Sequence, residues 1–594
     1  MADWDKAALS LGLSGDALME NAARAAFAAL RHFYGPLRGA RVLLIMGGGN
    51  NGGDAACLAR HLLDAGALPR VLHMKPLSAA RGAARRYALL ARRLGVPFAP
   101  AHSRRASRGR ASLSWSAFSD VPSAVPDIVV DGLLGTGFCG PLRQAEAAVI
   151  AGINALADAG ACVLALDLPS GLDAGSGRAA PDAVRASLTV TFQAPKPGLL
   201  IPEAAAYTGR LEVWPIGIPA AARSAASFRL WRGPASGRGA DITDPFVVSH
   251  GLTGLAAWDA PRPGRPGGRR PDAGSAAPAG WGEPAGAAGL AGPAHKGEAG
   301  RVLIIGGGAG MSGAPRLAAL GALRGGAGLV EVAVPAASMP EVRASLPEAL
   351  TVALPRPEEN RHAQWSARHL DALAPALAAA RAVVIGPGMG RMNGADQLLA
   401  ALLELSARPP LVLDADALHA LAERPEFLTR LDKRDILTPH PGEAARLLGL
   451  STARLREDRF GALSRLAALA PAVWVLKGPG TLIACPGEAS ILVPWNVPQL
   501  AVGGSGDVLA GLVGSLLAAG YSAPDAACAG VHLHALAGLS LAGRYPRRGN
   551  GPRDIADALP GAWARLENLG DQALGRPGFF CRTRGPRFGG GQPC

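Results

Sequence analysis

Three polar, glycine-rich segments in the first third of the chain hold side chains that could bind a charged ligand. They are residues 47–54 (GGGNNGGD), 131–137 (DGLLGTG) and 167–173 (DLPSGLD), and each follows a short apolar run that predicts a strand. In an open parallel sheet, ligands bind beyond the carboxyl ends of the strands, so three such loops predict one site. Their amide, carboxylate and hydroxyl oxygens suit a hard cation such as K⁺ or Mg²⁺ better than zinc.

The loop at residues 47–54 also fits the pattern GxGxxG between a strand and a helix, where backbone N–H groups cradle a phosphate. A nicotinamide-dependent dehydrogenase needs, in addition, an acidic residue at the end of the next strand. That strand ends in His73, Met74 and Lys75, which disfavours a redox Rossmann domain. The polar side chains of this loop fit helix capping as well as ligand binding, and the motif alone leaves both interpretations open.

A second candidate site lies in the last fifth of the chain. Residues 503–507 (GGSGD) precede a helix of small residues, whose first N–H groups would form an anion hole around Asp507. Asp507 could accept the proton of an attacking hydroxyl group while the hole stabilises a transferred phosphoryl group. We expect the helix N–H groups to keep Asp507 ionised at neutral pH. The alternative is a glycine turn in which Asp507 only caps the helix.

Two further motifs support this second site. Residues 477–481 (KGPGT) follow an apolar run and would place a cation and N–H donors near a nucleotide. A lone histidine is more often structural, but His440 lies between Pro439 and Pro441. Because the two prolines hold its backbone rigid, we favour a positioned contact for His440.

The elements that must position these residues alternate short apolar runs with amphipathic stretches, the pattern of α/β folds with mostly parallel sheets. The predicted strands are residues 41–46, 70–74, 127–131, 162–167, 188–192, 301–305, 329–334, 382–385, 410–413, 435–437, 473–476 and 481–485. Composition divides them between two domains, residues 1–225 and 295–568. Residues 260–294 contain 26 Gly, Pro or Ala residues out of 35, which predicts a flexible linker over 226–294. Residues 569–594 predict a disordered basic tail.

The charge distribution disfavours a nucleic-acid-binding protein. The chain has 594 residues and a net charge of +14, but nine arginines and no acidic residue lie within residues 81–110. The excess charge is therefore local. That stretch has almost no aromatic side chains between its arginines, and it predicts a solvated helix face followed by a loop.

Other features of the sequence indicate a cytoplasmic protein. Seven cysteines without a CxxC pair argue against a disulfide framework and for a reducing compartment. The first ten residues carry acids where a signal peptide needs bases. The longest apolar stretch, residues 508–523, is shorter than the ~20 residues of a membrane span and predicts a buried helix. We therefore expect neither a membrane nor a nucleic acid as a partner.

The first domain resembles the NAD(P)HX epimerase family. The resemblance is carried, in family order, by residues 18–24 (LMENAAR), 47–54, 131–143 (DGLLGTGFCGPLR), 165–177 (ALDLPSGLDAGSG) and 189–199 (TVTFQAPKPGL). It implies a Rossmann-like three-layer fold that holds K⁺ at Asn51, Asp131 and Ser170, with Asp167 as the candidate acid or base. The implied contacts to the hydrated nucleotide are Asn50, Asn51, Gly52, Gly53, Asp54, Gly135, Thr136, Gly137, Phe138, Cys139, Gly140, Pro141 and Asp167.

Two residues of this domain stand out against the family pattern or the composition. Ala55 is found where the family usually has glycine, and we expect the added methyl group to be tolerated at the start of a helix. Lys196 is one of only six lysines in the chain and lies within the APKPG motif. It is either a functional residue or a surface lysine between two prolines.

The second domain resembles the ADP-dependent NAD(P)HX dehydratase family over about residues 296–540. The motifs are residues 296–307 (KGEAGRVLIIGG), 386–390 (GPGMG), 414–418 (DADAL), 438–443 (TPHPGE), 477–481 and 503–507. The resemblance implies a ribokinase-like α/β fold that uses Mg²⁺, with ADP as the co-substrate. The implied contacts to the hydrate are Ala314, Gly388, His440 and Asp507, and those to the nucleotide are Lys477, Gly478, Pro479, Gly480, Thr481 and Gly506. Residues 496–500 (NVPQL) depart from the family's Gly-Asn-x-Gly-Met and put the nucleotide preference in question.

Together the two resemblances imply a bifunctional repair enzyme for hydrated NAD(P)H. The first domain would interconvert the R and S forms of NADHX and NADPHX. The second would phosphorylate the ring hydroxyl of the S form with ADP, or with ATP, and expel phosphate to restore NAD(P)H, so that ADP leaves as AMP. We expect a homo-oligomer. One alternative stays open, a ribokinase-like small-molecule kinase fused to a nucleotide-binding domain, because Gly-Ser-Gly-Asp alone does not distinguish a kinase from a dehydratase. Another is a second domain that has lost its activity.

Overall fold

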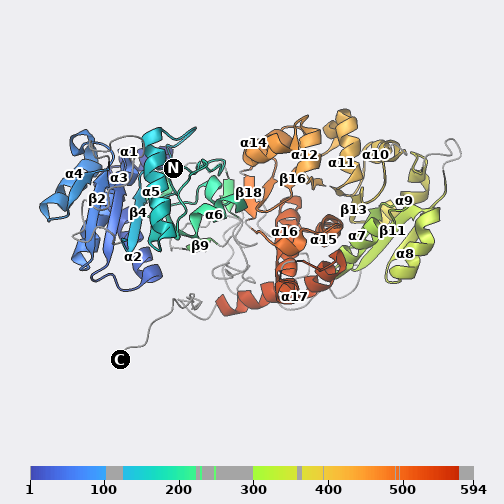
Figure 1. Ribbon diagram of the computed structural model, residues 1–594. Coiled ribbons are helices and arrows are strands. Elements are labelled where there is room, and N and C mark those ends of the chain that lie inside the picture. The colour runs from blue at the N-terminus through green and yellow to red at the C-terminus, as the bar shows by residue number, and fades with distance from the viewer. Residues whose placement is uncertain are drawn as a thin grey trace, which may run out of the picture.

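The computed structural model of the chain describes residues 2–101, 125–222, 228–230, 246–248, 299–356, 364–391, 394–488, 490–493, 495–546 and 548–573. These residues form two α/β units, each built around one mostly parallel sheet. Figure 1 shows the units side by side, the first coloured blue to teal and the second green to red. The composition-biased stretch 260–294, the predicted loop within the Arg-rich stretch and residues 574–594 lie outside the described residues.

The sheet of the first unit has the strand order β3-β2-β1-β4-β5-β6-β7-β9, and only β9 runs antiparallel to its neighbour. Its strands are β1 (Arg41–Met46), β2 (Leu68–His73), β3 (Phe98–Pro100), β4 (Ile128–Gly132), β5 (Cys162–Leu166), β6 (Leu188–Phe192), β7 (Arg210–Trp214) and β9 (Phe246–Val248). The order reverses between β1 and β4, and such a switch point opens a crevice for ligands. The three predicted ligand loops follow β1, β4 and β5, which are neighbours in this sheet.

Helices cover both faces of this sheet. They are α1 (Ala2–Ser10), α2 (Gly15–Tyr34), α3 (Asn50–Asp64), α4 (Gly82–Arg93), α5 (Gln144–Asp158) and α6 (Ala205–Thr208). Successive side chains of a strand point to opposite faces. Val42, Leu44 and Met46 of β1 therefore pack in a cluster with α2, α3 and α4, whereas Leu43 and Ile45 pack in another with α5. The unit has the Rossmann-like three-layer fold that the resemblance implied.

Helix α4 holds the first part of the Arg-rich stretch. It buries Ala84, Ala88 and Ala91 against the unit, while Arg85 and Arg92 are exposed. The alanine spacing of three and four residues matches one face of a helix. The predicted solvated helix face is therefore present in the structure.

The sheet of the second unit has the strand order β12-β11-β10-β13-β14-β15-β16-β17-β18-β8. Its strands are β10 (Arg301–Ile305), β11 (Leu329–Pro335), β12 (Leu350–Leu354), β13 (Ala382–Ile385), β14 (Leu411–Leu413), β15 (Ile436–Leu437), β16 (Val473–Leu476), β17 (Thr481–Ala484), β18 (Ser490–Val493) and β8 (Phe228–Leu230). The strands from β12 to β16 are parallel, and β17 and β18 turn back antiparallel. This arrangement is the ribokinase-like α/β fold that the resemblance implied.

Two helix layers also enclose the second sheet. The helices are α7 (Gly313–Arg324), α8 (Met339–Ser345), α9 (His369–Ala379), α10 (Ala395–Leu403), α11 (Asp416–Glu423), α12 (Pro441–Leu447), α13 (Thr452–Glu457), α14 (Arg459–Ala467), α15 (Ser505–Ala518), α16 (Ala523–Ser540) and α17 (Pro552–Ala573). Val302 and Ile304 of β10 pack with α7, α15, α16 and α17. Leu303 and Ile305 pack on the opposite face with α9 to α14.

Helix α15 is almost completely buried, as its apolar sequence predicted. Glycines allow it to touch α7 directly, because a Cβ on Gly511 would overlap the carbonyl oxygen of Ala318, and one on Gly321 would overlap that of Val508. Only glycine fits at such a crossing of two backbones. The crossing fixes where α15 begins, and hence where the loop at residues 503–507 lies.

The neighbouring helix α16 is the most apolar long helix of the described residues. The segment Ala523–Gly543 has the length and composition to cross a membrane, but 72% of its apolar window is buried inside the protein. It packs against α15 and α17 in the same buried cluster. We therefore interpret it as a core helix of the second unit.

The structure differs from the predicted boundaries in two places. β8 pairs with β18 and β9 pairs with β7, so both sheets use residues from the predicted linker, 226–294. Helix α17 runs to Ala573 and enters the predicted tail, 569–594. Strands of three residues give too short an alternation to be recognised in a sequence.

The two units share part of one hydrophobic cluster. Leu199 and Ile201, which follow β6 of the first unit, belong to the same buried cluster as Leu455 of α13. A cavity of about 550 Å³ lies between the units and is lined by Ser176 and Arg178 on one side and by α13 and α14 on the other. The segment after β6 and the loop after β5 therefore both contribute to the contact of the first unit with the second.

The crossing of α15 and α7 gives a test of this packing. We predict that Gly511→Ala lowers the free energy of unfolding by ~1–3 kcal/mol, because the added methyl group forces the helices apart. Gly561→Ala in α17 is the matched control, since nothing lies within 4 Å of its Cβ position. There alanine should be neutral or stabilising by up to ~1 kcal/mol. Calorimetric unfolding of both variants measures the difference, and equal stability of Gly511→Ala and wild type would contradict the helix contact.

Candidate active sites

The three predicted ligand loops of the first unit meet at the switch point of its sheet. Backbone contacts hold them together, because a Cβ on Gly47 would overlap the carbonyl oxygen of Leu133, and one on Gly52 would overlap that of Gly47. A Cβ added to Gly135 would lie 3.4 Å from Cβ of Asn51. The glycines of the motifs are thus required by the close approach of the loops.

A buried oxygen cluster lies where these loops meet. The Asp131 carboxylate is fully buried and accepts hydrogen bonds from Ser170 Oγ at 2.7 Å and Ser170 N at 2.8 Å, and from Leu133 N at 3.2 Å. Asn51 Nδ2 donates to the carbonyl oxygen of Leu134 at 2.6 Å, which leaves Asn51 Oδ1 buried without a hydrogen-bond partner among the described residues. Burial raises the pKa of Asp131 to about 6, even though the hydrogen bonds from Ser170 and Leu133 act to lower it.

The chemistry of this cluster suits a cation. All the groups that donate to Asp131 are neutral, so its negative charge is buried without a charged partner in these contacts. Burying an unpaired charge is unfavourable. A monovalent cation bound by oxygen atoms of Asn51, Asp131 and Ser170 would balance the charge and satisfy the orphan amide oxygen.

The capping interpretation of the first loop is wrong. Helix α3 begins at Asn50 with Gly49 as its N-cap, and no side chain makes a cap hydrogen bond there. The Asn51 side chain reaches across to the second loop instead. Ala55, the departure from the family pattern, is fully buried, and its Cβ lies 2.7 Å from the Cβ position of Gly132. The methyl group of Ala55 is accommodated because Gly132 has no side chain.

Asp167 lies at the end of β5 and forms a buried ion pair. Lys196 Nζ donates to Asp167 Oδ1 and also to Thr191 Oγ1 at 2.9 Å and to the carbonyl oxygen of Phe192 at 3.1 Å. Lys196 is only 4% exposed, so the interpretation as a surface lysine is wrong. Asp167 has a backbone φ of +64°, which is uncommon for a residue with a side chain and typical of functional sites.

Two further carboxyl groups lie in the field of this pair. Burial raises the pKa of Asp54 well above its usual value, the charges of Asp167 and Asp5 raise it further, and Lys196 opposes them. Asp5 comes from helix α1, and burial raises its pKa as well. Asp5 was not among the predicted site residues, because nothing in the sequence of residues 1–10 indicates that they lie beside the loops.

The other predicted substrate contacts form the outer part of this site. Asn50, Thr136, Gly137, Cys139, Gly140 and Pro141 are exposed, and Phe138 is half-buried. Gly52 and Gly53 lie inside, where a Cβ on Gly53 would come within 2.6 Å of Met19 Cε. The predicted residues thus divide into a buried inner set and an exposed rim.

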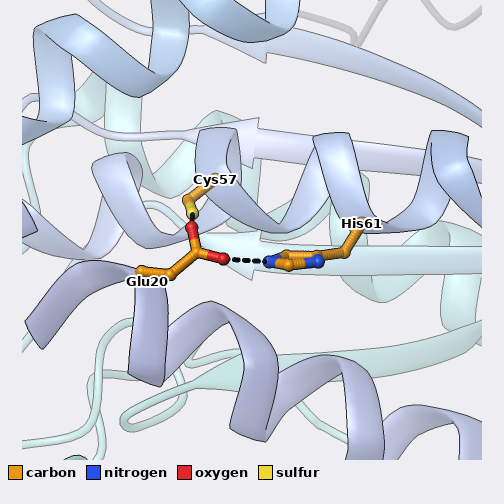
Figure 2. A group of neighbouring side chains, drawn as sticks. All are labelled: Glu20, Cys57 and His61. Atoms are coloured by element: carbon orange, nitrogen blue, oxygen red, sulfur yellow. Dashed lines mark hydrogen bonds and ion pairs between the residues drawn. The ribbon is translucent and has the colours of Figure 1, made fainter. Parts of the chain in front are cut away.

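Among the described residues, one group of side chains has the types and spacing of a transition-metal site. Glu20 of α2 and Cys57 and His61 of α3 place one ligand atom each within 4.8 Å of the others. Figure 2 shows the three side chains, with Glu20 between the other two. Arg60 Nη2, however, donates to both oxygens of Glu20 at 2.6 and 2.7 Å and lies 3.1 Å from His61 Nε2. A guanidinium cation already occupies the position of a metal, so we assign the group to the packing of α2 on α3.

The second site lies at the start of α15. Gly504 adopts a left-handed conformation with φ of +88° and ends the loop, and Asp507 lies in the first turn of the helix. Lys477 Nζ donates to Asp414 Oδ1 at 2.6 Å. The Cβ position of Gly506 is 3.3 Å from that Nζ, so the glycine leaves room for the lysine above the helix start.

Asp507 differs from its predicted state. Burial, together with the charges of Asp414, Asp416 and Glu443, raises its pKa to about 7, while the charge of Lys477 acts to lower it. The expectation that the helix N–H groups keep Asp507 fully ionised at neutral pH is therefore wrong. Burial and three neighbouring carboxylates outweigh both the helix dipole and one lysine.

The His440 side chain has a fixed position, as its flanking prolines predicted. The contacts that fix it belong to the N-terminal cap of helix α12. Its Nδ1 accepts from Gly442 N at 2.9 Å and from Glu443 N at 3.3 Å, and Glu443 Oε2 accepts from His440 N at 2.8 Å. This reciprocal pair is a capping box at the start of α12. Burial, together with Lys477, lowers the pKa of His440, so the ring is neutral with its proton on Nε2.

Ala314 and Gly388 lie together near the start of α7. Gly388 has φ of +64°, and its Cβ position is 3.0 Å from Cβ of Ala314 and 2.8 Å from the carbonyl oxygen of Met311. The loop at residues 503–507 contacts another part of the chain, because a Cβ on Gly504 would come within 3.2 Å of Pro552 Cβ. Two chain segments far apart in the sequence thus reach the region of the helix starts.

The loop at residues 477–481 has two residues with positive φ, Gly478 at +137° and Gly480 at +59°. Thr481 Oγ1 donates to the carbonyl oxygen of Gly478 at 2.9 Å, which closes the turn. Lys477 N donates to the carbonyl oxygen of Pro439 at 2.9 Å and ties the loop to the His440 turn. The predicted nucleotide contacts in this loop and the predicted hydrate contact His440 are therefore neighbours.

The segment that departs from the family pattern is built into the protein core. Gln499 is 1% exposed. Its side-chain Nε2 donates to the backbone carbonyl oxygen of Tyr545, and its backbone carbonyl oxygen accepts from Asn550 Nδ2, both at 2.9 Å. Behind the helix start, Ser505 Oγ lies 3.2 Å from His534 Nε2, and burial lowers the pKa of His534 to about 4. His534 could not be predicted as a site residue, because it lies in the middle of the apolar helix α16.

Comparisons with known proteins agree with this division into two sites. Residues 302–561 match the family model described as NAD(P)H-hydrate dehydratase, and residues 15–198 match the one described as YjeF-related protein N-terminus. The chain is 37% identical over 556 residues to the bifunctional NAD(P)H-hydrate repair enzyme Nnr of Moorella thermoacetica, which covers 93% of this chain and 92% of that protein. It is 34% identical to the Escherichia coli enzyme of the same name, over 93% of this chain and 90% of that protein.

A solved structure is also similar to the second unit. It is the ADP/ATP-dependent NAD(P)H-hydrate dehydratase from Bacillus subtilis, co-crystallised with ATP and Mg²⁺. The identity is 28%, the TM-score is 0.38, and the match covers 46% of this chain and 92% of that one.

Proposed function

Because the chain belongs to the family of bifunctional NAD(P)H-hydrate repair enzymes, we propose that its two sites carry out the two reactions of that repair. Residues 1–225 interconvert the R and S hydrates, and residues 295–568 dehydrate the S hydrate with an adenine nucleotide. The observation that carries this assignment is a pair of separate sites, each with an ion pair between a lysine and an aspartate at the carboxyl edge of its own sheet, in which one partner is buried and the other half-buried.

In the epimerase site, K⁺ would be held by Asn51, Asp131 and Ser170. The fit rests on the buried charge of Asp131 and on the orphan amide oxygen of Asn51. When bound, the ion supplies a positive charge beneath the loops that contact the nucleotide. By occupying this cluster, the ion would hold the loops after β1, β4 and β5 together in the shape that receives the substrate.

Asp167 is the proposed acid or base of the epimerase. The donors from Lys196, Thr191 and Phe192 all converge on Oδ1, so Oδ2 is the oxygen that those three groups leave available for proton transfer. Lys196 orients the carboxylate and balances its charge. The exposed rim of the site, with Thr136 and Gly137, would contact the outer parts of the substrate.

In the dehydratase site, Asp507 removes the proton of the ring hydroxyl as that oxygen attacks the terminal phosphoryl group. The N–H groups at the start of α15 stabilise the charge that develops on the transferred group. The carbon–oxygen bond then breaks and phosphate leaves, which restores NAD(P)H. A pKa of about 7 is well matched to a general base at neutral pH.

Adenine nucleotide and Mg²⁺ would bind next to Lys477. The loop at residues 477–481 and Gly506 contact the nucleotide, and Ala314, Gly388 and His440 contact the hydrate. The acidic side chains around Lys477, namely Asp414, Asp416 and Glu443, would supply oxygen ligands for Mg²⁺, because together they give the site an excess of negative charge. When bound, the metal neutralises phosphate oxygens.

The cation site gives a prediction for the epimerase. We expect epimerisation to rise with K⁺ concentration, and Asp131→Asn to abolish that response because the neutral amide attracts a cation less strongly. Asp173→Asn, in the loop after β5 but with its side chain hydrogen-bonded only within its own turn, is the control and should respond as wild type does. Chromatography of the R and S forms at constant ionic strength measures the rates. Equal wild-type rates without K⁺ would contradict the assignment.

Asp507 gives a prediction for the dehydratase. Asparagine fills almost the same volume and cannot accept the proton, so Asp507→Asn should lose roughly 10²-fold or more in dehydration rate. Asp525→Asn, in the first turn of the neighbouring helix α16, is the control and should retain activity. The recovery of NADH absorbance measures dehydration. Epimerisation by Asp507→Asn should equal wild type, and near-normal dehydration by this variant would show that Asp507 is not the base.

The raised pKa of Asp507 predicts the pH dependence of the same reaction. Only the ionised carboxylate accepts a proton, so kcat/KM for dehydration should rise with pH through about 7 and reach a plateau above it. Below pH 7 the slope should approach tenfold per pH unit. Initial rates between about pH 6 and 8.5 test this. A profile that is flat down to pH 6 would mean that Asp507 is ionised as the helix dipole alone predicts.

A further inference from the structure

Arg459, the first residue of α14, lies beneath the loop at residues 477–481. Its Nη1 donates to the carbonyl oxygen of Pro479 at 2.5 Å and its Nη2 to the carbonyl oxygen of Gly480 at 3.0 Å. The side chain is buried, with 9% of the residue exposed. Its planar guanidinium group therefore binds two successive carbonyl groups of the loop.

The loop needs such an external support. Gly478 and Gly480 both have positive φ, and glycine restricts the backbone least of all residues. The Thr481 hydroxyl holds the carbonyl oxygen of Gly478, so the side chains of Thr481 and Arg459 together bind three consecutive carbonyls. The contact with Arg459 is close, since the Cβ position of Gly478 is 3.4 Å from Nη2.

The first unit covers the other side of this contact. The Cβ position of Gly480 lies 3.5 Å from Cδ of Pro202 and 3.6 Å from the carbonyl oxygen of Leu200. Burial lowers the pKa of Arg459, and the charge of Glu203 partly offsets that change. Arginine stays charged inside proteins, so a cation is held in a dry position where its hydrogen bonds to carbonyl groups are strong.

We propose that Arg459 is a positioning residue for the adenine nucleotide, acting through the backbone of residues 477–481. This inference rests on the proposed function, because it takes that loop as the nucleotide-binding loop. Arg459 does not reach the reacting atoms. It fixes the conformation of Gly478, Pro479 and Gly480 before the nucleotide arrives, and thereby lowers the conformational entropy that is lost on binding.

The test compares Arg459→Met, Arg459→Lys and a matched control in the full chain. Methionine keeps the apolar stem and removes both donors, whereas lysine keeps the charge and reaches one carbonyl at a time. Arg465→Met is the control, because Arg465 lies on the same helix, is exposed and does not contact the loop in the hydrogen bonds of the structure. Each variant is assayed for dehydration against ADP concentration, for ADP binding by calorimetry and for epimerisation.

We expect Arg459→Met to raise KM and Kd for ADP about tenfold or more, the effect of losing two charged hydrogen bonds. The kcat at saturating ADP should stay within about twofold of wild type. Arg459→Lys should recover part of the affinity, and Arg465→Met should equal wild type. A near-normal kcat at saturating ADP shows that the second unit is folded, and normal epimerisation shows the same for the first.

Three results distinguish the possible failures. Unchanged KM and Kd for ADP in both Arg459 variants would overturn the positioning role and leave the proposed function intact. A fall in kcat with unchanged KM would also overturn it, because Arg459 would then act on the chemical step. If the wild-type chain itself shows no ADP-dependent dehydration, the proposed function fails instead. If Arg459→Met does not fold, the Kd of Arg459→Lys for ADP tests the proposal instead. A Kd equal to that of wild type would then reject the proposal.

Discussion

Each site of this protein depends on a negative charge buried at the carboxyl edge of a parallel sheet. A buried carboxylate is tolerated only when hydrogen bonds or an opposite charge compensate it. Lys196 compensates Asp167 in the first unit and Lys477 compensates Asp414 in the second. Two of the six lysines of the chain are thus used in this way. The surrounding loops are shaped to bring these groups together while keeping water away from them.

The two sites balance their charges differently, and this difference fits their chemistry. In the first, Asp131 has only neutral hydrogen-bond donors, so that a mobile ion is the natural counter-charge. In the second, Lys477 serves several carboxylates at once and leaves Asp507 close to half-ionised at neutral pH. A group in that state exchanges protons readily, which is what phosphoryl transfer to a hydroxyl group requires.

The contact between the units gives the segment after β6 a double role. It begins at Lys196, the partner of Asp167, and within a few residues Leu200 and Pro202 reach the loop at residues 477–481 of the second unit. Leu199 and Ile201 anchor the segment in a hydrophobic cluster that contains residues of both units. The lysine that pairs with Asp167 and the residues that pack against the loop at residues 477–481 therefore belong to one continuous stretch of chain.

The sequence determined the fold class, the central strands and the loops that form both sites, because buried parallel strands are apolar runs and strand ends carry distinct glycine motifs. It did not predict β7, β12 or β18. β12 is half-exposed, and β7 contains Glu212, whose burial depends on Arg210 and Trp214 beside it.

Only the tertiary structure decided the electrostatic state of the site residues. The pKa of Asp507 depends on Asp414, Asp416, Glu443 and Lys477, which different elements bring together. The burial of Lys196 depends on how the chain folds back after β6. The role of Arg459 depends on a loop twenty residues away. Charge interactions and burial are sums over neighbours in space, and the spacing of residues along a chain does not contain those neighbours.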